Sequence, residues 1–236
     1  GALGSKERAS DLEEFESKNH QNAVSKLRVT TSDGAKLDGR VIEPKATPVG
    51  DKKYVIWLNG LGESYESKLN NAVEYADHSG AGLLVFNYRG AGDSKGLSTS
   101  GQDYVTDTLA MVNYLKSTGI KEENITIHGY SMGGGIGADA AAQLEKVKFI
   151  NDRSFTSLSA AAKETVAKET ECKIGNGAAK ALGSFVGSLV ELADFDLSTK
   201  KIYEQSDSNN VNSLQSRTLI VAHKEDNIVN KSALAK

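Results

Sequence analysis

The chain has 236 residues, enough for one α/β domain with a complete hydrophobic core or at most two small domains. Its 28 basic and 31 acidic residues give a formal net charge of −3 without a basic cluster, so we expect no nucleic-acid partner. A single cysteine, Cys172, excludes an internal disulfide and favours a reducing compartment such as the cytoplasm.

Membrane and metal signals are absent from the sequence. No apolar run reaches 18 residues, so we expect no transmembrane segment, while transient contact with a membrane surface stays open. The cysteine and histidines lack zinc-site spacing, and we expect neither a metal nor a cofactor. Residues 1–5 are typical of a cloning remnant, and the chain has no initiator methionine, so any native targeting segment would be out of view.

The first 42 residues predict a helix followed by a β-hairpin. Ser10 and Glu13 have the spacing of a capping box, which opens a polar helix expected to run to about Lys26 and to form an N-terminal unit over 6–26. Residues 27–31 and 36–42 are β-like runs joined by the turn residues 32–34.

The rest of the chain alternates apolar strands with helical periodicity. The strands are continuous apolar runs, which is typical of a parallel sheet covered on both faces; they are expected at 53–58, 82–88, 125–128, 147–151 and 217–222. We therefore predict an α/β fold with a mostly parallel, twisted sheet and helices on both faces, spanning 27–236. Residues 157–214 look like a helical insert, interpreted either as a cover for a pocket or as an ordinary crossover helix.

One stretch has the pattern of a nucleophile elbow. Gly129-Tyr130-Ser131-Met132-Gly133 follows an apolar strand and leads into an alanine-rich helix, the context that the Gly-x-Ser-x-Gly motif requires. The glycines allow a turn too tight for side chains, and the helix directs its free N–H groups at the place where a negative oxygen would form. A glycine-rich connection with a bystander serine is the alternative.

Polar residues also follow the neighbouring strands. The polar residues that follow the predicted strands, in chain order, are 59–62, 89–94, Ser131, Asp152 and Asp226. The carboxyl ends of parallel strands meet at one edge of a sheet, where ligands bind in such folds. This coincidence is the strongest sequence argument for a functional site.

The four ordered motifs resemble those of the α/β-hydrolase superfamily over roughly residues 27–230. Residues 59–62 (NGLG) match the oxyanion loop, residues 88–94 (YRGAGDS) the turn after the next strand, residues 129–134 (GYSMGG) the elbow, and residues 226–229 (DNIV) the turn that carries the acid. Residues 59–66 and 152–155 are also similar to hydrolase-like proteins of Chlamydia and Legionella, some of which are translocated effectors. Translocation into a host cell is not readable from the sequence itself.

The resemblance implies roles for individual residues. Ser131 would attack a carbonyl carbon, the backbone N–H groups of Leu61 and Met132 would hold the oxyanion, and Asp226 would orient a histidine. Asp152 is the fallback acid, and its structural alternative is a salt bridge with Arg153 or Arg89. Asp226 has an alternative too, as an ordinary turn or cap residue.

The histidine of this pattern is missing. The family places its base after one more strand, yet the sequence has no histidine after Asp226. His128 is expected to be buried on the elbow strand, and His223 is too close to Asp226 to reach Ser131 easily. Three explanations stay open: the sequence stops before the final strand, helix and histidine, a partner supplies the base, or the protein is a pseudo-hydrolase. We prefer the first, because a parallel sheet without its last strand would expose an apolar edge.

The sequence therefore predicts a serine hydrolase that cleaves a carboxylic ester or thioester, with a small molecule, a lipid or an acyl group as substrate. The alternative is a catalytically inactive binding or scaffold protein on the same fold. No feature selects an amide over an ester, and the glycine spacing after the elbow does not fit a dinucleotide fingerprint. The oligomeric state is not encoded in any of these patterns.

Overall fold

The computed structural model of the protein describes residues 5–17, 22–46, 51–154 and 214–221. The predicted insert at 157–214 lies outside the described residues, except for Leu214. Residues 222–236 also lie outside them. The described strands form one sheet of seven, in the order β1-β2-β4-β3-β5-β6-β7. They are β1 (Val24–Thr30), β2 (Lys36–Ile42), β3 (Tyr54–Leu58), β4 (Gly82–Phe86), β5 (Ile125–Tyr130), β6 (Lys148–Asp152) and β7 (Thr218–Val221).

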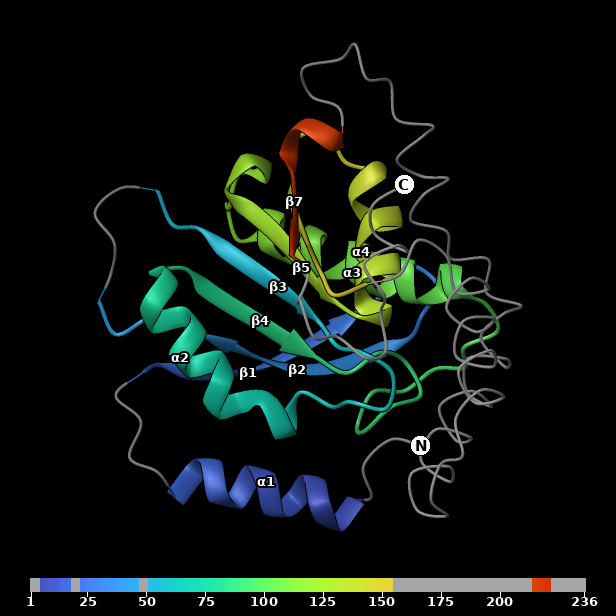
Figure 1. Cartoon of the computed structure of the whole chain (residues 1–236). Helices are drawn as coiled ribbons and strands as arrows, with labels where there is room; N and C mark the ends of the chain where they lie inside the picture. Colours follow the sequence, from blue (N-terminus) through green and yellow to red (C-terminus); the bar gives the residue numbers. More distant parts are fainter. Residues whose placement is uncertain (1–4, 18–21, 47–50, 155–213, 222–236) are drawn as a thin grey trace, which may run out of the picture.

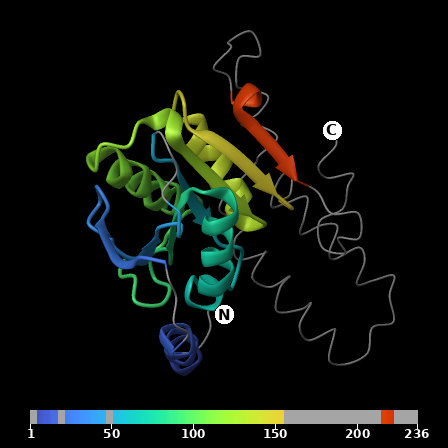
Figure 2. The same ribbon diagram turned by 90° about the vertical axis from the view of Figure 1, so that its left-hand side faces the viewer.

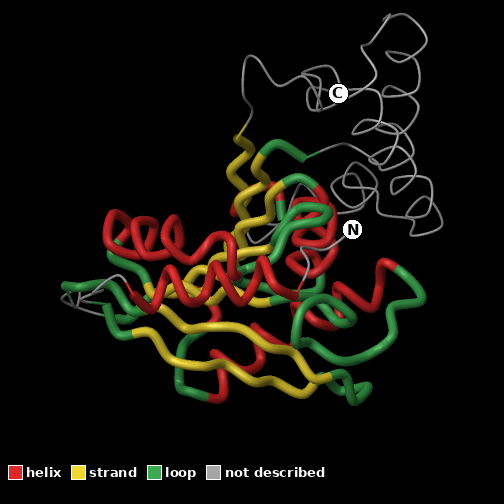
Figure 3. Tube along the Cα trace, turned by 90° about the horizontal axis from the view of Figure 1, so that it is seen from below, coloured by secondary structure: helices red, strands yellow, loops and turns green. Residues whose placement is uncertain are grey.

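The sheet is parallel except at one end. β3 pairs in parallel with β4 and β5, and the parallel pairing continues through β6 to β7. β1 and β2 form an antiparallel hairpin, and β2 also pairs antiparallel with β4. In Figure 3 the strands at one end of the sheet run across those at the other, which shows the twist. The predicted mostly parallel sheet with an N-terminal hairpin is confirmed.

Helices cover both faces of this sheet, as Figures 1 and 2 show. α3 (Gly101–Ser117) and α4 (Met132–Ala142) pack on one face, and α2 (Leu69–Ser79) packs on the other, with α1 (Ser5–Ser17) beside it. Short 3₁₀ turns precede three elements: η1 (Glu66–Lys68), η2 (Glu122–Asn124) and η3 (Gln215–Arg217). Among the described residues, no helix is both long and apolar enough to cross a bilayer.

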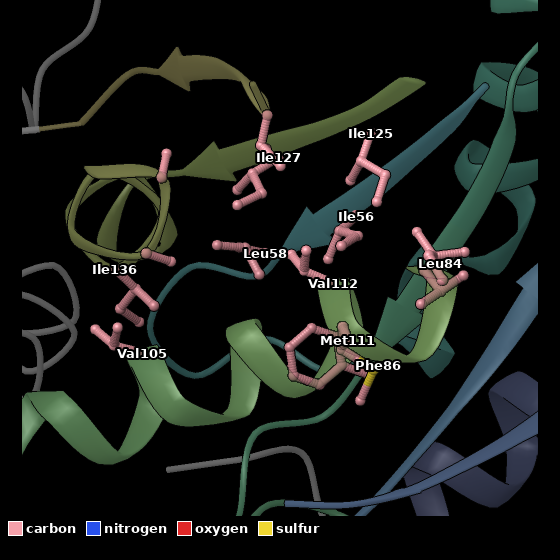
Figure 4. Close-up of a cluster of buried hydrophobic side chains, with 14 of the residues drawn as sticks. Ile56, Leu58, Leu84, Phe86, Val105, Met111, Val112, Ile125, Ile127 and Ile136 are labelled. Carbon is pink, nitrogen blue, oxygen red and sulfur yellow. The ribbon is translucent and has the colours of Figure 1, made fainter. Parts of the chain in front are cut away.

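The larger core lies between the sheet and the helices α3 and α4. Figure 4 shows side chains from three parallel strands meeting those of the two helices, among them Ile56, Phe86, Ile127, Met111 and Ile136, all of which are fully or almost fully buried. Burying a side chain of this kind contributes roughly 1.5–3 kcal/mol. The central strands are thereby held rigidly, and their carboxyl ends form a fixed platform for a site.

The N-terminal helix differs from the sequence prediction. α1 begins at Ser5, so Ser10 lies inside the helix and is not its N-cap, and the helix ends at Ser17 instead of about Lys26. Residues 24–26 instead pair with residues 40–42 of β2. The weak helix propensity of a polar segment is overridden here by the ladder hydrogen bonds of the hairpin. Phe15 is buried and anchors α1 on the α2 side of the sheet.

Candidate active site

Ser131 lies at a sharp turn between β5 and α4. Its backbone has φ 51° and ψ −115°, a combination that residues with a side chain rarely adopt. The turn is possible only because of the flanking glycines: a Cβ at Gly129 would lie 2.2 Å from the carbonyl oxygen of Gly133, and one at Gly133 would lie 2.4 Å from that of Leu58. The strand–turn–helix context expected for the motif is therefore present.

Backbone hydrogen bonds fix the serine from both sides. The N–H of Ser131 donates to the carbonyl oxygen of Asp152 at 3.0 Å, and the N–H of Gly134 donates to the carbonyl oxygen of Ser131 at 3.0 Å. Met132 is the first residue of α4, so its N–H has no acceptor inside the helix. Ser131 is half-buried, and its Oγ has no hydrogen-bond partner within the part of the chain that the structure describes.

The loop after β3 packs directly against this elbow. Asn59 anchors it, because its Nδ2 donates to the carbonyl oxygen of Phe86 at 3.2 Å. A Cβ at Gly133 would lie 2.9 Å from the carbonyl oxygen of Asn59, and one at Gly60 would lie 3.1 Å from the ring of Tyr130. Leu61 follows immediately, and no described residue accepts a hydrogen bond from its N–H. The structure thus brings the loop of Leu61 beside the elbow.

The turn after β4 is held by an ion cluster around the buried side chain of Arg89. The guanidinium donates to Asp107 at 2.8 Å and to Asp33 at 2.6 Å, and it lies 3.6 Å from Asp103. The backbone N–H of Arg89 also donates to Asp107 at 2.8 Å. The guanidinium lowers the pKa of Asp33 to about 2, chiefly through its hydrogen bond. This cluster ties the turn to α3, so Arg89 serves the scaffold and is not the partner of Asp152.

Asp152, the fallback acid, points to the face covered by α2. Its Oδ2 lies 3.5 Å from Nε2 of His128, and its Oδ1 accepts a hydrogen bond from Nε of Arg153 at 2.9 Å. His128 is buried, as expected, and its Nδ1 lies 3.0 Å from the hydroxyl of Tyr75. Burial alone would raise the pKa of Asp152, but the hydrogen bonds and charges of His128 and Arg153 lower it below its ordinary value.

A cavity of about 380 Å³ opens on this same face. Aromatic side chains from three elements and two cationic side chains line it, namely Trp57, Tyr75, Tyr130, Lys68 and Arg153. Ser131 is not part of the lining, although Tyr130 directly precedes it. The sequence analysis did not identify Lys68, which ends the turn η1, or Tyr75, which lies in α2. No family motif marks either residue.

The predicted acid Asp226 and the neighbouring His223 lie outside the described residues. Asp226 and His223 both follow β7, where the description ends, so their relation to Ser131 is not part of the geometry above. The other histidine that is described, His78, uses its Nδ1 at 2.7 Å from the carbonyl oxygen of Glu74 in the last turn of α2. Within the described ranges, no cluster of three or more acidic, histidine or cysteine side chains could hold a metal ion.

Comparison with known proteins identifies the family. A family model described as "alpha/beta hydrolase fold" matches residues 53–172. Two curated relatives are proteins named "Multifunctional-autoprocessing repeats-in-toxin": one from Vibrio vulnificus, 34% identical over 127 residues, and one from Vibrio cholerae, 41% identical over 90 residues. These alignments cover 51% and 38% of the chain, but only about 2% of the length of each relative.

Solved structures give the same fold. An esterase from Pyrococcus furiosus superposes with a TM-score of 0.67 over 99% of this chain and 78% of its own length, at 21% identity. An alpha-beta hydrolase from Vibrio vulnificus superposes with a TM-score of 0.58 over 86% of this chain and 65% of its own, at 27% identity. The overall fold described above therefore recurs in solved proteins.

Proposed function

Because the chain belongs to the alpha/beta hydrolase fold family, we propose that it is a serine hydrolase that cleaves a carboxylic ester or thioester through an acyl-enzyme on Ser131. The observation that carries the proposal is the conformation of Ser131, which is held at φ 51° between β5 and α4. Strained backbone of this kind persists only where the surrounding structure enforces it, and it clusters at active sites.

The geometry around Ser131 supports the chemistry of acyl transfer. The Oγ would attack the carbonyl carbon of the substrate, its proton would pass to a base, and the carbonyl oxygen would become an oxyanion. The free N–H groups of Met132 and Leu61 are the proposed donors to that oxygen, each contributing roughly 3 kcal/mol in related sites. Departure of the alcohol or thiol leaves the acyl-enzyme, which water then hydrolyses.

The proposed acid is Asp226, which follows β7, the last strand that the structure describes. Asp152 is less suited to this role, because its carboxylate already pairs with His128 and Arg153. His128 is not free to act as the base, since its two ring nitrogens face Tyr75 and Asp152. The histidine that Asp226 would orient is therefore to be sought outside the described residues.

A binding protein on the hydrolase fold is the second candidate. The observation that favours it is the engagement of both described histidines: His128 in the network with Asp152, and His78 with the carbonyl oxygen of Glu74. Such a protein would keep the elbow as architecture and hold an acyl or small ester ligand without turnover.

A fluorophosphonate probe separates the two candidates, because it reacts covalently only with an activated serine. The proposal predicts labelling of the full-length protein at neutral pH, loss of labelling in Ser131→Ala, and full labelling in Ser25→Ala, which removes an exposed serine on β1. A folded protein that neither labels nor hydrolyses p-nitrophenyl esters and acyl thioesters of graded chain length would support the binding protein instead.

A further inference from the structure

Glu63 closes the loop that follows β3. Its Oε2 accepts a hydrogen bond from the backbone N–H of Gly60 at 2.9 Å, and its own N–H donates to the carbonyl oxygen of Gly60 at 3.3 Å. These two hydrogen bonds tie both ends of residues 60–63 into one turn. Gly62 inside the turn has φ 74°, a conformation that glycine adopts without strain.

The closed turn engages the backbone amides of Gly60 and Glu63 and leaves those of Leu61 and Gly62 without an acceptor among the described residues. The N–H of Gly60 is taken by the Glu63 carboxylate, whereas the next amide, that of Leu61, has no acceptor among the described residues. Gly60 lies close to both the Tyr130 side chain and the Glu63 carboxylate: a Cβ at Gly60 would lie 3.1 Å from the ring and 3.3 Å from Oε2 of Glu63. The turn is therefore fixed against the residue that precedes Ser131.

A carboxylate in this position needs a counter-charge. Unpaired, it would oppose the negative charge that develops on a substrate oxygen nearby. Lys68 supplies the counter-charge, with its Nζ 2.8 Å from Oε1 of Glu63. The two carboxylate oxygens thus have separate tasks, since Oε2 holds the turn and Oε1 pairs with the ammonium group.

We propose that Glu63 is a positioning residue, whose hydrogen bond to Gly60 aims the Leu61 amide at the oxyanion formed when Ser131 attacks an ester. The inference rests on the proposed function, because the aim of this amide matters only if Ser131 reacts with a carbonyl. Glu63 does not touch the reacting atoms. Lys68 assists by cancelling the charge that the carboxylate brings to the site.

Three substitutions separate the hydrogen bond from the charge. Glu63→Ala removes both, Glu63→Gln keeps an oxygen that accepts from Gly60, and Lys68→Met leaves the carboxylate without its counter-charge. Loss of an oxyanion donor lowers kcat about 10²–10³-fold, so a misaimed donor in Glu63→Ala should lower kcat roughly 30-fold with little change in KM. Glu63→Gln should lose only about threefold, and Lys68→Met more than that. Glu74→Ala, an exposed carboxylate on α2, is the matched control and should keep the wild-type kcat.

A second measurement tests the hydrogen bond between Glu63 and Gly60 without relying on catalysis. Amide hydrogen exchange at Gly60, resolved by NMR, should be about tenfold faster in Glu63→Ala than in the wild type, and close to wild type in Glu63→Gln. If Glu63→Ala does not fold, the order of kcat between Glu63→Gln and Lys68→Met decides the question.

The inference is overturned if Glu63→Ala keeps its kcat within twofold while the wild type hydrolyses esters, or if Glu63→Gln is as slow as Glu63→Ala. Either result leaves the proposed function intact. A folded wild type that neither labels with fluorophosphonate nor hydrolyses esters refutes the proposed function, and this inference with it.

Discussion

Nε2 of His128 lies 3.5 Å from Oδ2 of Asp152, on the face of the sheet that α2 covers. The two side chains come from adjacent parallel strands, β5 and β6. Because the carbonyl oxygen of Asp152 accepts the hydrogen bond from the N–H of Ser131, the pair braces the strand end that holds the serine. A histidine–carboxylate pair therefore exists beside the elbow, but we interpret it as a support for the turn and not as the catalytic acid and base.

Exchanging either aspartate for asparagine tests this interpretation. Asp226→Asn should lower kcat by about 10⁴-fold, because a catalytic histidine then loses the carboxylate that sets its tautomer. Asp152→Asn keeps the shape of the side chain and should lower kcat by less than about tenfold, through small shifts of the elbow. Ester hydrolysis under saturating substrate measures both. The reverse order of effects would make Asp152 the acid.

The environment of Asp152 predicts that the stability of the protein depends on pH. The pKa of Asp152 in the folded protein lies below its ordinary value of 3.8, because the hydrogen bonds and charges of His128 and Arg153 outweigh the effect of burial. A group of this kind stabilises the fold fully above its unfolded pKa, and the contribution is lost as the pH falls through the folded pKa. Urea unfolding should therefore show a larger difference between wild type and Asp152→Asn at pH 6 than at pH 3. Equal differences at the two pH values would exclude this role.

The sequence was sufficient for the parallel strands, the hairpin and the elbow. Continuous apolar runs and the Gly-x-Ser-x-Gly pattern consist of residues that are neighbours in the sequence, so they can be recognised without a structure. The predicted end of α1 was wrong. Residues 24–26 pair with β2, and the sequence does not reveal a contact between segments that are apart in the chain. The contact of Tyr75 with His128 has the same origin, because it joins two distant segments. Glu63 contacts Gly60 and Lys68 within one short stretch of chain, but no family motif marks these contacts.

Adding one methyl group at Gly133 should disrupt the elbow. A Cβ there would lie 2.4 Å from the carbonyl oxygen of Leu58, and backbone atoms cannot move aside as a flexible side chain can. Gly133→Ala should therefore destabilise the protein by about 2–3 kcal/mol, although alanine favours helices over glycine by about 1 kcal/mol. Urea unfolding measures the loss, and labelling of Ser131 should fall with it.

Gly119→Ala is the control for that substitution. Gly119 has φ 90° and no atom within 4 Å of its ideal Cβ position, so only backbone strain opposes the methyl group. Its cost should be about 1 kcal/mol, with labelling of Ser131 unchanged. Equal losses in the two variants would show that crowding at the elbow is not the cause.

Glycine at position 131 should be more stable than alanine at the same position. Both substitutions remove the hydroxyl, but only glycine accommodates φ 51° without strain, which costs a residue with a side chain about 1–3 kcal/mol. Against this, the greater entropy of glycine in the unfolded chain lowers the stability of the glycine variant by about 0.4–1 kcal/mol. The net advantage of Ser131→Gly over Ser131→Ala should therefore be about 1 kcal/mol in urea unfolding. The exposed Asn113 in α3 provides the opposite case, since glycine there should be less stable than alanine by about 1 kcal/mol. If alanine were the more stable residue at both positions, the turn at Ser131 would hold no strain, and the main structural support for its role as a nucleophile would be lost.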